Sequence, residues 1–410
     1  MALENTPESV VVVGAGIGGL TLAALLSSQG VSVDVVEQAA KPGDVGAGIQ
    51  LGPNAMHVLS ALGLGPALAE LGFAPQDAIL RQFNTGKPLL KTGLNPLHQE
   101  RYGQPYLHVH RADLHAALLE IALAFKARLH FGQKTIAIHR EPGLVRLDCE
   151  SGSFIGDVLA GADGVHSMVR ESVVNQSSPT PGPQLSANAL FTGQTAWRGL
   201  VPAHRLPKGL ISPDANVWLG PGKHFVAYYV RGGTLINFVA VREKDSWTEE
   251  SWHQKGDVEE LRSSFSGWDS AVTQLLDACG ECHYWGLFDR PRLDCWYHER
   301  VVLLGDACHP MLPFMAQGAA MAIEDAWVLG TRLNDTRLSL DQSLEVYQRE
   351  RLARTSLMQK RSSDNAELYH RSKPVGVALR NMSFKIATAI PGVTHSVLDS
   401  IYGLNVTQLD

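Results

Sequence analysis

Three short segments carry residues suited to holding a nucleotide cofactor. The first, GAGIGG, supplies Gly14, Gly16 and Gly19 in the G-x-G-x-x-G pattern, between an apolar run and a predicted helix. A second predicted strand then ends in Glu37, about twenty residues later. Such glycines let a pyrophosphate approach the backbone, and such a carboxylate binds ribose hydroxyls. We therefore predict a βαβ unit that binds a dinucleotide, the alternative being a tight strand-to-helix turn that is merely rich in glycine.

The second segment spans residues 301–330. Its first four residues are apolar and predict a buried parallel strand, after which Asp306 stands at the carboxyl end, where open α/β sheets place their ligands. Residues 317–320 begin a predicted helix whose first turn has free N–H groups and the positive end of the helix dipole. Gly318 and Ala319 would let a flat ring that gains negative charge on reduction approach this turn closely.

The third segment, GADGVHSMVR, contains Asp163, and a separate position, Arg111, precedes another predicted helix. Asp163 either closes over the pyrophosphate of the cofactor or caps the helix that follows it. Arg111 either reaches a phosphate or the linker of the cofactor, or forms a surface ion pair with Asp113.

Residues 42–54 form a glycine-rich stretch with neither helical nor strand period. A loop of this length beside a pyrophosphate favours a larger, extended cofactor over a simple dehydrogenase arrangement. Gln50 within it is expected either to face the reacting end of the cofactor or to lie in a surface turn.

The stretch from residue 180 to 289 loses helical period. Alternating segments at 194–200, 216–219, 224–230 and 234–241 predict an antiparallel sheet, with Gly232-Gly233 as a hairpin turn. Alternation places His224 and Tyr228 on one face, which suits the wall of a pocket. A hydrogen-bonded core histidine is the alternative for His224. An earlier hairpin is expected from 145–149 and 154–159.

Length and composition limit the class of protein. The 410 residues predict an α/β chain with three parts: a discontinuous cofactor-binding domain (1–75, 100–180 and 285–330), a β-sheet substrate domain (76–99 and 181–284) and a C-terminal helical region (331–410). The net charge of −6 argues against nucleic acid as a partner, and the sequence contains no run of eighteen apolar residues that would predict a membrane span. The polar N-terminus is no signal peptide, and five cysteines fit a reducing, cytoplasmic setting.

The cysteines offer one metal-like pattern. Cys279 and Cys282 form a C-x-x-C, and Cys295 and His298 follow it. Because the intervening residues predict a strand rather than a small metal-held loop, we expect packed thiols and no metal, with Cys308 also a packing residue. The C-terminal tail, residues 374–410, is expected to dock on the rest of the chain as a helix. A dimer contact and a membrane-surface contact are the alternatives.

Together, and in this order, the three motifs resemble those of the single-component FAD-dependent aromatic hydroxylases, the para-hydroxybenzoate hydroxylase family, and most nearly its salicylate, 3-hydroxybenzoate and 6-hydroxynicotinate hydroxylases. The resemblance implies that FAD is bound by Gly14, Gly16, Gly19, Glu37, Gln38, Arg111, Asp163, Asp306, Gly318 and Ala319. It also implies that NAD(P)H binds without a domain of its own, consistent with a chain that has one Rossmann fingerprint.

The implied activity is hydroxylation of a phenolic or heteroaromatic compound with NAD(P)H and O₂, through a flavin hydroperoxide that must be kept dry. His224 is the expected base, Tyr228 would orient the substrate, and Pro310 would line the reaction site. The pocket is expected to contain Gln50, Met311, Leu312 and Phe314, with Met315 nearby.

Some features depart from these relatives. Hydroxynicotinate hydroxylases carry a histidine at the positions that Gln50 and Phe314 occupy by this resemblance. Arg81 and Arg198 are unranked candidates for binding a substrate carboxylate. The alternatives are a hydroxylase of a larger phenol or quinone precursor, a flavin-dependent reductase or dehydrogenase, and a non-catalytic binding protein. The chain is expected to be a monomer or a homodimer.

Overall fold

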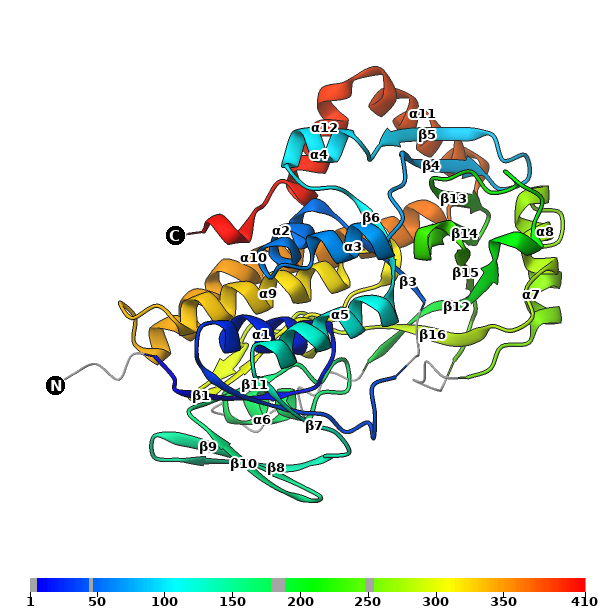
Figure 1. Cartoon of the computed structure of the whole chain (residues 1–410). Coiled ribbons are helices and arrows are strands. Elements are labelled where there is room, and N and C mark those ends of the chain that lie inside the picture. Colours follow the sequence, from blue (N-terminus) through cyan, green and yellow to red (C-terminus); the bar gives the residue numbers. More distant parts are fainter. Residues whose placement is uncertain (1–5, 44–46, 178–188, 248–253, 410) are drawn as a thin grey trace.

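The computed structural model describes residues 6–43, 47–177, 189–247 and 254–409. Its elements form two main sheets, with a layer of helices on the first and a long helix reaching toward the second (Figure 1).

The first sheet has six strands in the order β17 (Tyr297–His298), β18 (Val301–Leu303), β11 (Val158–Gly161), β1 (Ser9–Val13), β2 (Ser32–Val36) and β7 (Arg128–His130). All pairs are parallel except β17 with β18. The four inner strands, β18, β11, β1 and β2, are rich in valine and largely buried, as expected for a parallel sheet covered on its faces. Helices α1 (Ile17–Ser28), α5 (Arg111–Ala124) and α9 (Gly318–Leu333) pack against one another beside it (Figure 1).

The second sheet has seven strands in the order β16 (His283–Asp289), β12 (Leu190–Pro202), β15 (Leu235–Glu243), β14 (Lys223–Val230), β13 (Ala215–Gly220), β4 (Asp77–Gln82) and β5 (Pro88–Gly93). Only β13 and β4 pair in parallel. Large aromatic residues on one face, among them Trp197, Phe225 and Phe238, share a core with helices α7 (Val258–Ser264) and α8 (Ser270–Asp277). The other face of this seven-stranded sheet is turned away from α7 and α8.

Smaller elements complete the chain. Strands β3 (Gly48–Leu51) and β6 (Leu107–His110) pair with each other, and β8 (Thr135–Glu141), β9 (Leu144–Cys149) and β10 (Gly152–Gly156) form a third sheet. The remaining helices are α2 (Pro53–Ala61), α3 (Gly65–Leu71), α4 (Leu97–Tyr102), α6 (Met168–Ser177), α10 (Leu340–Tyr369), α11 (Pro374–Ala389) and α12 (Pro391–Tyr402).

The mixed α/β class and the hairpin turn predicted at Gly232-Gly233 are confirmed. The hairpin predicted from 145–149 and 154–159 is formed by β9 and β10, but two local predictions were wrong in extent. Residues 154–159 are two strands, because Asp157 leaves β10 and its N–H donates to the Ser9 carbonyl, which starts β11 beside β1. The stretch 42–54 is not wholly a loop, since Gln50 lies in β3. The division into domains stays a prediction.

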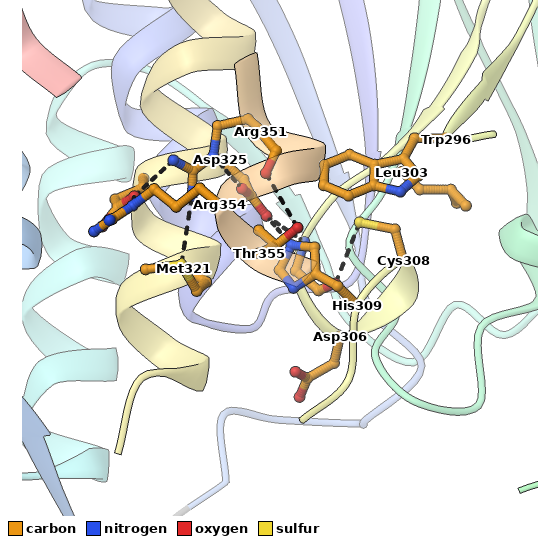
Figure 2. Close-up of polar contacts among 12 residues, drawn as sticks. Trp296, Leu303, Asp306, Cys308, His309, Met321, Asp325, Arg351, Arg354 and Thr355 are labelled. Carbon is orange, nitrogen blue, oxygen red and sulfur yellow. Dashed lines mark hydrogen bonds and ion pairs between the residues drawn. The ribbon is translucent and has the colours of Figure 1, made fainter. Parts of the chain in front are cut away.

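A buried cluster of charged side chains joins α9 to α10 (Figure 2). The Arg351 guanidinium donates to Asp325 at 2.7 Å and to Glu324 at 2.6 Å, and Arg354 also binds Glu324. His309, in the turn after β18, donates a hydrogen bond from Nε2 to the Asp325 carboxylate. Burial raises the pKa of Asp325, but the neighbouring His309 and Arg351 outweigh burial and hold it at about 2. The cluster therefore stays ionised at neutral pH.

Replacing Arg351 by methionine should lower the free energy of unfolding by about 3–5 kcal/mol, because it removes the cation that binds both buried carboxylates and leaves an excess of buried negative charge. Urea unfolding followed by circular dichroism measures this loss. Lys360→Met is the matched control on the same helix, since the Lys360–Asp364 pair is exposed and should be worth less than about 1 kcal/mol. Equal losses in the two variants would contradict this assignment.

Candidate active site

The predicted cofactor residues follow the carboxyl ends of four adjacent strands. In the order β18-β11-β1-β2, these ends lead to Asp306, Asp163, the Gly14 turn and Glu37. Because the four strands are parallel, all these ends lie at one edge of the sheet. Open α/β sheets bind their ligands at this edge. Their roles in binding remain predictions, but their convergence is a property of the fold.

The glycine turn is closely packed on one side and open on the other. Gly14 has φ +102°, and a Cβ there would lie 2.5 Å from the Ala162 carbonyl oxygen. A Cβ on Gly19 would lie 2.0 Å from the Gly14 carbonyl oxygen, so helix and strand meet without side chains. Around Gly16, by contrast, nothing described lies within 4 Å of such an atom. The turn thus offers bare backbone with open space before it, which fits a pyrophosphate.

Glu37 lies beside this turn. Its carboxylate accepts hydrogen bonds from the backbone N–H groups of Ala15, at 2.9 Å, and Ala39, at 2.8 Å. The side chain is therefore held next to the glycine turn, at the position expected for a ribose partner, and Gln38 is exposed beside it.

Asp306 carries a half-buried carboxylate with few protein partners. Among the described residues its carboxylate accepts no hydrogen bond, whereas its backbone carbonyl accepts one from Arg170 at 2.9 Å. Burial raises the pKa of Asp306, and the nearby charges of His309, Arg111 and Arg170 oppose that rise. An acceptor held in this way is suited to hydroxyl groups of a bound linker.

The contacts of Asp163 and Arg111 bear on the two interpretations given for each of them. The Asp163 carboxylate accepts from the Ser167 hydroxyl at 2.5 Å and from the Val169 N–H at 3.2 Å, so it caps the first turn of α6. For Arg111, the Asp113 carboxylate suggested as its ion-pair partner is bound by Arg231 at 2.7 Å. The positive charge of Arg111 also opposes the rise in the pKa of Asp306, which places it near the proposed cofactor linker.

The amino terminus of α9 fits an electron-rich ring. Within the described chain no side chain caps this helix, whose first residue is Gly318 and whose N-cap is Gln317. The Gln317 amide oxygen is itself engaged by Asn54 at 3.0 Å. A Cβ on Gly318 would meet only Met311, at 3.7 Å. Free N–H groups and the positive end of the dipole thus face a surface without bulky side chains, with Ala319 next to it.

The loop from Pro310 to Met315 is held by one face of α10. Gln359 donates to the Pro310 carbonyl at 2.9 Å, Ser362 to the Leu312 carbonyl at 2.6 Å, and Asn365 to the Phe314 carbonyl at 3.2 Å. The three donors are spaced three residues apart and so share a helix face. Sequence reasoning did not identify these three donors, although polar residues at this spacing on a helix could have suggested a contact with another segment.

The face of the seven-stranded sheet that is turned away from α7 and α8 has a partly open centre. Val217, Val226 and Val239 lie in register on three adjacent strands, with Arg198 next in the same row. We call the three valines the valine row. All four side chains are half-buried, although the row lies in the interior of the sheet. Val239 packs near Leu312 and Phe314, so the row lies beside the α10-held loop.

His224 lies on one side of the valine row, two residues along β14 from Val226. It is buried, its ring lies 5.2 Å from the Phe314 ring and 5.4 Å from the Tyr369 ring, and its Nδ1 is 2.7 Å from Nε2 of His370. Burial lowers the pKa of His224 well below its ordinary value, and the neighbouring His370 adds to this. The imidazole is therefore neutral at physiological pH.

Tyr228 lies on the other side of the row. Burial raises its pKa, while hydrogen bonds from Arg198 and Gln50 oppose the rise. Gln50 also accepts from the Tyr106 hydroxyl at 2.6 Å, and Arg198 donates to the Gly48 carbonyl at 2.5 Å. Gln50, Tyr228, Arg198 and Tyr106 therefore form one polar group. Sequence reasoning had not identified Tyr106 as one of its members.

Arg81, the other candidate for a carboxylate, has structural partners. Its guanidinium donates to Asn216, to the Gly86 carbonyl and to Ser212, at 2.9–3.1 Å. Arg198 is therefore the better placed of the two.

The thiols are packed and free. Cys279 donates to the Glu281 carbonyl, and burial raises the pKa of both Cys279 and Cys282, to about 12 for Cys282. Cys308 lies with His309 and Asp325 so that their ligand atoms are within 4.8 Å of one another. Because Asp325 already binds His309 and Arg351, this buried group is explained without a metal.

Comparisons with known proteins agree with this geometry. Residues 8–362 match the FAD binding domain family. The 3-amino-4-hydroxybenzoate 2-monooxygenase of Streptomyces platensis is 37% identical over 92% of this chain and 92% of its own length. The 3-hydroxybenzoate 6-hydroxylase of Polaromonas naphthalenivorans is 35% identical over 97% of this chain and 96% of its own.

Solved structures agree as well. Salicylate hydroxylase in its substrate complex is similar with a TM-score of 0.80 at 26% identity, over 98% of this chain and 97% of that one. Klebsiella pneumoniae HpxO, complexed with FAD and uric acid, has a TM-score of 0.82 at 25% identity, over 96% of both chains. Among the described residues, no helix combines the length and apolar content that crossing a bilayer requires.

Asp306→Ala should weaken FAD binding without lowering the stability of the FAD-free protein. We expect the dissociation constant for FAD to rise about ten- to hundredfold, as for loss of a hydrogen bond to a charged group. The FAD-free protein should not lose stability, because the substitution removes a half-buried charge that has no hydrogen-bonded partner of its own. Flavin fluorescence titration and thermal unfolding of the FAD-free protein measure the two effects. Unchanged FAD affinity would remove Asp306 from the cofactor site.

Proposed function

This chain belongs to the FAD binding domain family of FAD-dependent aromatic monooxygenases, and from that premise we propose that it hydroxylates a hydroxybenzoate- or salicylate-like aromatic acid. The observation that carries the proposal is the valine row, a half-buried apolar strip with a neutral histidine on one side and an arginine–tyrosine group on the other.

Four parts of the chain would hold FAD. The Gly14–Gly19 turn and Glu37 would bind its ADP half, Arg111 and Asp306 its linker, and the first turn of α9 its ring. When bound, FAD supplies the redox chemistry through which NAD(P)H and O₂ place one oxygen atom on an aromatic ring.

The valine row is proposed to carry the aromatic ring of the substrate. His224 and Tyr228 are four residues apart on one strand, so their Cα atoms are separated by about 13 Å. Their side chains thus frame the row rather than fill it. A ring lying on the valines would present its hydroxyl to His224 and its carboxylate to Arg198 and Tyr228.

His224 acts in this proposal as the base for the aromatic hydroxyl. A phenol that has lost its proton is a more electron-rich ring and attacks oxygen more readily, and a base within hydrogen-bond reach promotes that loss. Neutral imidazole is the form that accepts a proton.

The loop after β18 is proposed to exclude water. Pro310, Met311, Leu312 and Phe314 place apolar groups between the sheet and the first turn of α9, and α10 fixes their backbone. Dry surroundings prevent proton leakage and side reactions of reactive oxygen species.

A panel of aromatic acids tests the activity. With 3-hydroxybenzoate, salicylate, 6-hydroxynicotinate and 3-amino-4-hydroxybenzoate, at least one compound should accelerate NAD(P)H oxidation and gain one oxygen atom by mass spectrometry. The reaction should stop without O₂. Turnover that persists under nitrogen with another electron acceptor, and without an oxygenated product, would instead indicate a reductase.

Arg198→Met should raise KM for the preferred acid about ten- to hundredfold, as for loss of a charge-assisted hydrogen bond. The value for the corresponding phenol without a carboxylate should change little, because that ring makes no contact with the guanidinium. Steady-state kinetics on both compounds measure the difference. Arg81→Met is the control in the same sheet and should raise neither value. Parallel rises for acid and phenol would show that Arg198 supports the site without binding the carboxylate.

A further inference from the structure

A line of three ionisable side chains leads from the valine row to solvent. His224 Nδ1 lies 2.7 Å from His370 Nε2, and His370 Nδ1 lies 3.5 Å from Oε1 of Glu243. The side chain of His370 is 2% exposed, whereas that of Glu243 is 58% exposed. The line therefore starts at a buried imidazole and ends at a carboxylate in water.

The backbone holds the three residues together although they lie far apart in the sequence. The Gly222 N–H, in the turn between β13 and β14, donates to the His370 carbonyl at 3.1 Å. The Gly222 carbonyl in turn accepts from the Glu243 N–H at 2.9 Å. The end of α10, the β13–β14 turn and the end of β15 are thus joined at one glycine, which fixes the spacing of the two side chains.

His224 has one ring nitrogen left for a ligand. Nδ1 is engaged by His370, and among the described residues Nε2 makes no hydrogen bond. The ring lies on the same sheet face as the valine row and packs edge-on against Phe314 and Tyr369.

We propose that His370 and Glu243 are positioning residues that set the tautomer of His224 and conduct the proton of the aromatic hydroxyl to solvent. This inference rests on the proposed function and on His224 as the base in it.

The tautomers follow from Glu243. A carboxylate accepts hydrogen bonds only, so when the exposed Glu243 side chain rotates to reach His370, the nitrogen that faces it, Nδ1, carries the proton. In neutral His370 the other nitrogen, Nε2, is then an acceptor, and it receives the Nδ1–H of His224. His224 Nε2 is left as a bare lone pair on the side of the substrate. A second group that orients the base in this way is a common feature of catalytic histidines.

The proton balance is simple. The phenolic O–H bond breaks and its proton binds His224 Nε2, while the Nδ1 proton of His224 passes to His370 Nε2. The Nδ1 proton of His370 passes to the Glu243 carboxylate and from there to water. The substrate becomes a phenolate, each imidazole stays neutral with its tautomer exchanged, and no oxidant or reductant takes part.

Burial explains why a relay is needed. Burial lowers the pKa of both histidines, to about 4 for His370, so a lasting positive charge on either ring is unfavourable. A base that passes a proton on as it receives one avoids that charge. The 3.5 Å gap to Glu243 exceeds an ordinary hydrogen bond, and its exposed side chain can close it by rotation.

The test uses the ultraviolet difference spectrum of 3-hydroxybenzoate, or of whichever phenolic acid the panel identifies, bound to the oxidised FAD-loaded enzyme. This spectrum reports the bound phenolate directly and requires no turnover. In His370→Phe we expect the phenolate band to be lost and kcat to fall about a hundredfold, the lower range for general acid–base catalysis. The dissociation constants for FAD and for the acid should change less than about threefold.

Glu243→Gln keeps a hydrogen-bond acceptor for His370 but cannot take up a proton at neutral pH. It should reduce the phenolate band and kcat while leaving KM near the parent value, and as an exposed substitution it should not affect folding. Glu281→Gln, another exposed carboxylate at an end of the same sheet, is the matched control and should behave as the parent.

The outcomes separate the two levels of inference. If the parent hydroxylates an acid but His370→Phe and Glu243→Gln keep the full phenolate band and kcat, the relay is wrong and the proposed function stands. If no phenolic acid binds as a phenolate or is hydroxylated by the parent, the proposed function fails and the relay fails with it.

Discussion

The buried pairing of Arg351 with Glu324 and Asp325 is the interaction on which the rest of the candidate site depends. It joins α10 to α9, and through Asp325 it reaches His309 and the backbone N–H of Gly305 in the turn after β18. The helix whose first turn would meet the cofactor ring, and the turn that carries Asp306, are therefore positioned by the same carboxylates. Because taking charges out of water is costly, a buried ionic cluster is weak evidence for stability even when its charges are paired. We infer that this cluster also serves to fix the positions of α9, α10 and the turn after β18 relative to one another.

Two sheets contribute different halves of the site. The parallel sheet presents glycine backbone and carboxylates along one edge, and the antiparallel sheet presents a half-buried apolar row between His224 and Tyr228. The loop at Pro310–Met315 lies between them, and its backbone is bound to α10 rather than to either sheet. The relative placement of cofactor and substrate surfaces thus depends on one long helix.

Sequence reasoning found the parts whose signal is local. The spacing of Gly14, Gly16 and Gly19, the acid after β2 and the small residues at the start of α9 each reflect contacts within a short segment. It could not find Gln359, Ser362 and Asn365, because their partners lie about fifty residues away and any polar helix face looks alike. The strand at Gln50 was missed for a similar reason, since β3 is defined by pairing with β6 rather than by its own alternation. The helix-capping role of Asp163 had been recognised as an alternative but could not be chosen without the contacts of Ser167 and Val169.

The burial of the cysteines has a consequence for the protein's durability. A flavin enzyme that reduces O₂ releases hydrogen peroxide whenever its reaction runs without product, and peroxide attacks thiolates far faster than thiols. Burial raises the pKa of Cys149, Cys279, Cys282 and Cys308, so each stays protonated, and each has little contact with water. Cys295 is the half-exposed exception. The four buried thiols are therefore protected from such peroxide, which leaves Cys295 as the most accessible of the five cysteine sulfur atoms.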